Sequence, residues 1–171
     1  MLRVTAVCIG STPEIRKEPV TAAVLGRHGL EGDRHATETV KIRAGKRKGE
    51  VIFNERQWSA IGDEEMAELG KTLGVVLPIG ALGENFRLTG QADLTHLPFG
   101  SSLRFPSGAV LLVSGQNLPC QRQADYLAGL FGMPELARSF VKAAADLRGI
   151  VGWIETPGAV APGDQVTLEI P

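Results

Sequence analysis

Short apolar runs separated by glycine, proline and small polar residues make up most of the chain. Val4-Thr5-Ala6-Val7-Cys8-Ile9 is apolar and largely β-branched, which is typical of a buried strand. Phe105-Pro106-Ser107-Gly108-Ala109 has proline and glycine where a tight reversal between two strands needs them. The pattern predicts strands at residues 2–10, 18–26, 50–54, 86–91, 101–105, 109–114 and 164–170.

Helical periodicity replaces this pattern in three stretches. The first begins at Gly62-Asp63-Glu64-Glu65-Met66, where the acidic residues suit a helix N-terminus. The second follows Cys120 and ends at Gly132 and Pro134. The third runs from Pro134 or Glu135 to Arg148, with Gly149 beyond its end.

The order of these elements indicates the fold class. Strands that mostly follow one another in hairpins, without alternating crossover helices, favour an antiparallel barrel over a doubly wound sheet. No repeat, linker or change in composition divides the 171 residues, so we expect a single domain spanning 1–171. We therefore expect a mainly β, barrel-like fold with a few helices, in which both chain ends are neighbouring strands.

Composition and charge exclude several classes of protein. A hydrophobic content of 43% excludes a disordered chain, and a net charge of −1 provides no overall field for nucleic acid. No apolar stretch approaches the roughly 20 residues that span a bilayer, and the N-terminus lacks a signal-peptide pattern. We expect a cytoplasmic protein that binds neither membrane nor nucleic acid. One local run is basic and is typical of a solvated loop or hairpin, although it could steer an anionic ligand: Lys41, Arg43, Lys46, Arg47 and Lys48.

The two cysteines differ in their surroundings. Cys8 lies within the buried strand pattern, where we expect it to serve packing. Cys120 follows Leu118-Pro119, and Pro119 prevents a helix from running through the turn. Cys120 is therefore expected near the free N–H groups of the next helix, with Arg122 close by. Both features favour the thiolate, which is the nucleophile and the soft-metal ligand, although a small buried hydrophobe is the alternative. The different settings argue against a disulfide and fit a reducing cytoplasm.

Two further polar clusters could contribute to a site with Cys120. Gly29-Leu30-Glu31-Gly32-Asp33-Arg34-His35 is too polar for a core strand and too rich in glycine for a helix, so it is expected to be a loop. Pro78-Ile79-Gly80-Ala81-Leu82-Gly83-Glu84-Asn85-Phe86 places an acid and an amide at a corner. Each cluster could equally be an ordinary turn, and Asp33, His35 and Glu84 could alternatively form a divalent-metal hydrolase site. We expect the clusters to converge with Asn117, Cys120 and Arg122 on one open pocket.

Taken in order, these clusters resemble the MOSC domain, the family named after the C-terminal domain of molybdenum cofactor sulfurase. The resemblance also includes Pro98-Phe99-Gly100-Ser101-Ser102-Leu103 and Gly163-Asp164-Gln165-Val166, and it spans residues from about 3 to 170. It implies a barrel-like MOSC fold and a role in the chemistry of the molybdenum cofactor (molybdopterin) or in sulfur transfer.

By this resemblance, Cys120 is the catalytic residue, either as a persulfide carrier or as a molybdenum ligand. The activity would be sulfur transfer or the molybdenum-dependent reduction of N-hydroxylated compounds, with a sulfur donor or redox protein as partner. The alternative is a non-catalytic cofactor-binding or regulatory module in which Cys120 is structural. Pyridoxal phosphate is not expected in this chain alone, because we find no activated lysine with a phosphate cradle. The candidate cofactor-binding residues are Gly32, Asp33, Arg34, His35, Gly83, Glu84, Asn85, Asn117 and Arg122.

Overall fold

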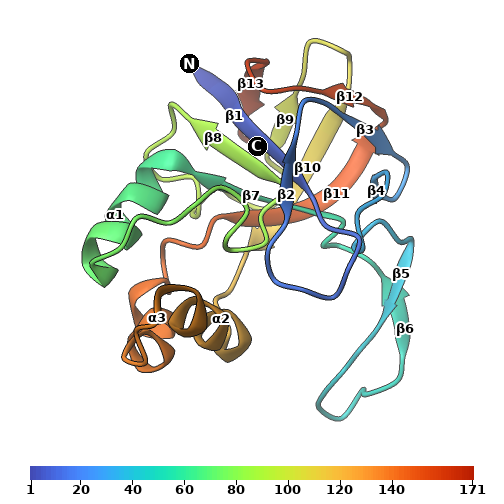
Figure 1. The fold of residues 1–171 in the computed structure, drawn as a ribbon. Coiled ribbons are helices and arrows are strands. Elements are labelled where there is room, and N and C mark those ends of the chain that lie inside the picture. Colours follow the sequence, from blue (N-terminus) through green and yellow to red (C-terminus); the bar gives the residue numbers. More distant parts are fainter.

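A closed ring of seven strands forms the centre of the molecule (Figure 1). The computed structural model describes all residues, 1–171. The strands pair in the order β13 (Gln165–Glu169), β9 (Ser102–Arg104), β10 (Val110–Gln116), β11 (Ile150–Thr156), β7 (Trp58–Gly62), β8 (Phe86–Thr89) and β1 (Leu2–Ile9). Pairing of β1 with β13, with Leu2 opposite Val166, closes the ring. All pairs are antiparallel except β7 with β8, and β2 (Glu18–Val20) adds to the open side of β1.

Alternating side chains fill the barrel. In β1, Leu2 and Val4 point into the core while Arg3 and Thr5 are exposed, which is the period-two pattern of a strand with one buried face. Aromatic rings join neighbouring parts of this core, because Phe86 lies 6.2 Å from Trp58 and 6.3 Å from Phe105 between ring centroids. The barrel interior is therefore a packed core, and a binding site has to lie at its rim.

The remaining elements lie around the barrel. A small sheet contains β12 (Gly158–Val160), β3 (Ala23–Gly26) and β4 (Gly29–Leu30), and a separate hairpin contains β5 (Thr39–Lys41) and β6 (Val51–Phe53). Figure 1 shows that this hairpin projects away from the barrel. The helices are α1 (Asp63–Leu73), α2 (Gln121–Phe131) and α3 (Leu136–Ala143), and they share a second apolar core with residues such as Ile61, Leu82 and Phe140.

Most expected features are present. The fold is a mainly β barrel with three helices, and the chain ends are paired strands. The turn at residues 105–109 is closed by backbone hydrogen bonds between Phe105 and Ala109 (3.0 Å) and between Gly108 and Phe105 (3.0 Å). Helix α2 begins directly after Cys120 and ends at Gly132, which has φ 63°. No helix of the structure has the length and apolar character that crossing a membrane would require.

Several predicted bounds were wrong. Residues 18–26 form two strands in different sheets, and α3 ends at Ala143 instead of reaching Arg148. The sequence pattern also missed β7 and β11, which are central to the barrel. Gly152 weakens the strand pattern of β11, but the structure requires a glycine there, because a Cβ would collide with the carbonyl oxygen of Leu112 and the ring of Trp58.

Candidate functional site

A cavity of about 450 Å³ lies at the rim of the barrel, where the polar loops meet the N-terminus of α2. Its lining contains five arginines, one histidine and one thiol, and no carboxylate. A larger cavity of about 570 Å³ runs along α1, but it contains neither a thiol nor a histidine. The polar residues around the smaller cavity are Ser11, Arg34, His35, Arg43, Arg56, Ser59, Asn85, Asn117, Cys120, Arg122, Gln123 and Arg148.

Cys120 is exposed and lies at the N-cap of α2, with extended backbone angles of φ −138° and ψ 161°. Its backbone N–H donates to Oε1 of Gln123 at 3.2 Å, which fixes the first turn of the helix against the preceding loop. The helix N-terminus and the surrounding guanidinium groups both give this end of the cavity a positive potential. The thiol is therefore accessible and lies in a positive field.

Arg148 lines the same cavity as this thiol and is 2% exposed. Its Nη2 donates to the carbonyl oxygen of Leu82 at 2.5 Å, and its Nε donates to Gln123 Oε1 at 3.4 Å. Burial lowers the pKa of Arg148 to about 10, while the negative charges of Glu84 and Cys120 oppose this shift. Gln123 thus connects a buried cation to the backbone of Cys120.

Arg56 approaches the same site from the chain just before β7. Its Nη2 donates to Oδ1 of Asn117 at 2.7 Å. Burial lowers the pKa of Arg56, and the charge of Cys120 acts in the opposite direction, so this guanidinium lies within electrostatic range of the sulfur. Asn117 is itself held by a backbone hydrogen bond to Gly149 at 2.8 Å.

Two other arginines fix one wall of the cavity. Arg34 donates to the carbonyl oxygens of Thr12 at 3.1 Å and Ile15 at 3.5 Å, and Arg122 donates to the carbonyl oxygen of Pro13. These contacts hold the loop of residues 11–16, which contributes Ser11, Pro13 and Ile15 to the lining. Both arginines therefore shape the cavity as well as charge it.

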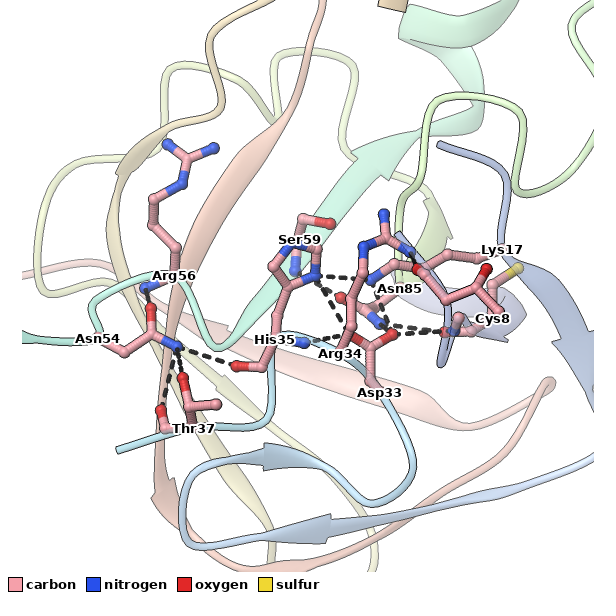
Figure 2. A network of polar contacts seen from close by, with 12 residues as sticks. Cys8, Lys17, Asp33, Arg34, His35, Thr37, Asn54, Arg56, Ser59 and Asn85 are labelled. Atoms are coloured by element: carbon pink, nitrogen blue, oxygen red, sulfur yellow. Dashed lines mark hydrogen bonds and ion pairs between the residues drawn. The ribbon is translucent and has the colours of Figure 1, made fainter. Parts of the chain in front are cut away.

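Asp33 is the centre of a buried polar network behind the cavity (Figure 2). Its carboxylate accepts from Lys17 Nζ at 2.8 Å, from Asn85 Nδ2 at 2.9 Å, and from the backbone N–H groups of His35 at 2.9 Å and Gly10 at 3.1 Å. Burial opposes ionisation of Asp33, but the hydrogen bonds from His35 and the charge of Lys17 lower its pKa below the ordinary value. The network holds the loop of residues 33–35 against β1 and β8.

His35 borders the cavity beside this network. Its Nδ1 lies 3.2 Å from Asp33 Oδ1 and 3.4 Å from Lys17 Nζ. The hydrogen bond to Asp33 raises the pKa of His35, but burial and the nearby charge of Lys17 outweigh it and leave the pKa lowered. A neutral imidazole at neutral pH follows.

Glu84 has a similar supporting position. Its two carboxylate oxygens accept from the backbone N–H groups of Gly80 at 2.7 Å and Leu82 at 3.1 Å, and Oε1 also accepts from Arg87 Nε at 2.9 Å. The side chain has no exposure to solvent. Glu84 therefore shapes the corner of residues 80–85 from inside the protein.

A family model described as the MOSC domain matches residues 31–167. The chain belongs to the MOSC domain family. Its relative YuaD from Bacillus subtilis (strain 168), named for a suggested role in metal-sulfur cluster biosynthesis, is 42% identical over 146 residues, which are 82% of this chain and 76% of YuaD.

Several solved structures share the fold of this chain. The crystal structure of YuaD from B. subtilis matches with a TM-score of 0.92 at 35% identity, covering 100% of this chain and 97% of that chain. YiiM from Geobacillus stearothermophilus has a TM-score of 0.68 at 18% identity and shares the fold, covering 99% of this chain and 75% of its own. YiiM from Escherichia coli has a TM-score of 0.64 at 19% identity, with coverages of 99% and 70%.

In this MOSC domain, seven of the ten candidate catalytic and cofactor-binding residues lie together around the cavity: Arg34, His35, Gly83, Asn85, Asn117, Cys120 and Arg122. Gly32, Asp33 and Glu84 do not line it. Gly32 is an exposed turn residue with φ 83°, and the two acids are buried behind the wall, because their carboxylates are used by backbone N–H groups and internal cations. Asp33, His35 and Glu84 do not form the metal site considered as an alternative, since no three His, Cys, Asp or Glu residues are grouped to hold a metal ion.

Sequence reasoning missed three charged residues of the MOSC site region. Arg56 and Arg148 each stand just before a strand that the pattern did not predict, so nothing placed them beside Cys120. Lys17 is a fully buried lysine in a polar stretch that reads as a surface loop. A prediction that included β7 and β11 would have placed Arg56 and Arg148 at the rim of the barrel.

Proposed function

We propose that this protein is a sulfur carrier linked to the molybdenum cofactor, in which Cys120 accepts a sulfur atom and passes it on. The observation that carries this proposal is an exposed thiol at a helix N-terminus, within a cavity lined by five arginines and no carboxylate. A thiolate and a persulfide are both anions, so this lining stabilises the loaded and the unloaded forms.

The transfer needs only sulfur nucleophiles. The Cys120 thiolate attacks the outer sulfur of a donor persulfide, the sulfur–sulfur bond of the donor breaks, and its electron pair leaves on the donor thiolate. Cys120 then holds the persulfide. An acceptor thiolate attacks the outer sulfur in turn, and Cys120 leaves as thiolate. Arg56 and Arg148 offset the negative charge on sulfur during both steps, and Gln123 holds Cys120 in place.

The residues present also fit the molybdenum–pterin cofactor. A thiolate suits a soft metal that carries sulfur ligands, and the buried guanidinium of Arg148, whose Nη1 has no protein partner, suits an anionic group such as the cofactor phosphate. Cys120 would hold the metal, and Arg56, Arg122 and Arg148 would hold the phosphate. The bound cofactor would supply oxygen-atom transfer or receive the sulfur, and molybdenum-dependent reduction of N-hydroxylated compounds is the corresponding second function.

The proposal is tested by loading the pure protein with sulfur from a cysteine desulfurase and cysteine. We expect the intact mass to increase by one sulfur atom in the wild type and in Cys8→Ala, but not in Cys120→Ser. No increase in the wild type under conditions that load another thiol carrier would contradict sulfur carriage.

A second measurement separates carrier from metal ligand. The protein is purified from a host that makes the molybdenum cofactor, and its molybdenum content is measured. Molybdenum near one atom per chain that is lost in Cys120→Ser would favour the ligand role. Cofactor retained equally by Cys120→Ser, without sulfur loading of the wild type, would favour the non-catalytic binding module.

A further inference from the structure

Arg148 is a buried cation whose pairing is incomplete. Its Nη2 and Nε donate to Leu82 and Gln123, but Nη1 has no hydrogen-bond acceptor in the protein. No ion pair reaches it, because Glu84 is engaged by Arg87 and by two backbone N–H groups. A buried guanidinium with an unused donor is costly unless an anion completes its hydrogen bonding.

Arg56 offers a second guanidinium to the same place. The two arginines and Cys120 line one cavity. Burial has the largest effect on the pKa of Arg148, and the charges of Glu84, Arg56 and Cys120 have smaller effects. Arg56 lines the cavity and uses one N–H for Asn117, and its other guanidinium donors have no hydrogen-bond partner in the protein. Paired guanidinium forks are suited to tetrahedral oxyanions. The arrangement therefore places an oxyanion beside a nucleophilic sulfur.

We propose that Arg56 and Arg148 bind the sulfonate group of thiosulfate, and that this anion loads Cys120 with sulfur. The inference rests on the proposed function, because it names the class of sulfur donor for the same thiol. A phosphate group would satisfy the arginines equally well, but it carries no sulfur to transfer, so the two ligands are distinguished by their products.

The step balances without an external oxidant or reductant. The Cys120 thiolate attacks the outer sulfur of thiosulfate and forms the new sulfur–sulfur bond. The bond from that sulfur to the sulfonate sulfur breaks, and its electron pair leaves with sulfite. Cys120 is left as a persulfide, and a thiol acceptor or cyanide then takes the outer sulfur and restores the thiolate. Negative charge builds on the sulfite oxygens as the bond breaks, where the two guanidinium groups stabilise it.

Thiosulfate:cyanide sulfur transfer tests the proposal, with thiocyanate as the measured product and the intact mass of the protein as a second readout. We compare the wild type with Arg56→Gln, Arg148→Lys and the control Arg138→Gln, an exposed position on α3 outside the cavity. Arg56→Gln and Arg138→Gln remove the same charge from the protein. We expect wild-type and Arg138→Gln rates to agree, and Arg56→Gln and Arg148→Lys to lose roughly ten- to a hundredfold in rate.

Loading by inorganic polysulfide provides the comparison, because polysulfide has no sulfonate group. We expect Arg56→Gln and Arg148→Lys to slow loading of Cys120 by polysulfide much less than loading by thiosulfate, and inorganic phosphate to slow only the reaction with thiosulfate. Loading by polysulfide but not by thiosulfate would overturn the assigned donor and leave the proposed function intact, whereas failure of both would contradict the proposed function itself. Equal thiosulfate rates in Arg56→Gln and Arg138→Gln would overturn the sulfonate site, and this comparison stands even if Arg148→Lys fails to fold.

Discussion

At the scale of single residues, the two cysteines show how surroundings decide chemistry. Cys8 is completely buried in β1, where burial raises the pKa of its thiol to about 12, while Cys120 is exposed at the start of α2. We expect iodoacetamide to modify Cys120 alone in the folded protein at neutral pH, and Cys8 only after unfolding. Peptide mapping with and without denaturant measures this ranking. Faster modification of Cys8 in the folded state would contradict it.

The buried pair of Lys17 and Asp33 is a second residue-scale feature with a measurable effect. Lys17→Met would leave the Asp33 carboxylate buried without its cation, so we expect a loss of about 3–5 kcal/mol in the free energy of unfolding. The double variant Lys17→Met/Asp33→Asn removes both charges and should recover part of this loss. Denaturant titration of the wild type, Lys17→Met, Asp33→Asn and the double variant measures the coupling, and additive effects of the two substitutions would show that the pair is not coupled.

The same carboxylate predicts a pH dependence. The folded-state pKa of Asp33 is lowered, so the unfolded chain binds the proton more readily and Asp33 stabilises the protein above its ordinary pKa. We expect this stabilisation to be lost as the pH falls below about 4, and the loss to be smaller in Asp33→Asn. Thermal unfolding midpoints measured across this range give the test. An acid dependence identical in the two proteins would contradict the lowered pKa.

At the scale of elements, the corner of residues 80–85 depends on close backbone contact. Gly80 has φ 79°, and a Cβ there would collide with the carbonyl oxygen of Lys17, whereas Gly74 has a similar φ of 71° and nothing within 4 Å of the same position. Both substitutions to alanine incur the cost of the left-handed conformation, about 1–2 kcal/mol. We expect Gly80→Ala to be clearly more destabilising than Gly74→Ala by denaturant titration. Equal losses in the free energy of unfolding would contradict this, because they would mean that the corner accommodates the added methyl group without further cost.

Element prediction from the sequence succeeded where local chemistry determines structure. The acidic start of α1, the Cys120 start and Gly132 end of α2, and the turn after Phe105 were all correct. It failed at β7 and β11, because strand identity there depends on neighbours across the barrel. In β11, position 152 must be a glycine because Leu112 and Trp58 leave no room for a side chain, and these neighbours are present only in the assembled sheet.

At the scale of the whole molecule, the barrel brings together loops that are distant in the sequence. Arg34, Arg56, Asn85, Cys120 and Arg148 come from five separate stretches and line one cavity. The sequence indicated three of the contributing clusters, and it correctly separated Cys8 from Cys120. The sequence could not show that the carboxylates of Asp33 and Glu84 lie behind the cavity wall. They are held there by the internal cations Lys17 and Arg87, and these contacts form only in the folded protein.

The central claim is that Cys120 carries sulfur, and the state of this residue in the cell tests it most directly. Cells producing the protein are lysed into excess alkylating reagent, which traps thiols and persulfides as they stand, and the peptides containing Cys8 and Cys120 are analysed by mass spectrometry. The account predicts an additional sulfur atom on a fraction of the Cys120 peptide and none on the Cys8 peptide. A Cys120 peptide without additional sulfur, in cells where a known persulfide carrier is loaded, would contradict it.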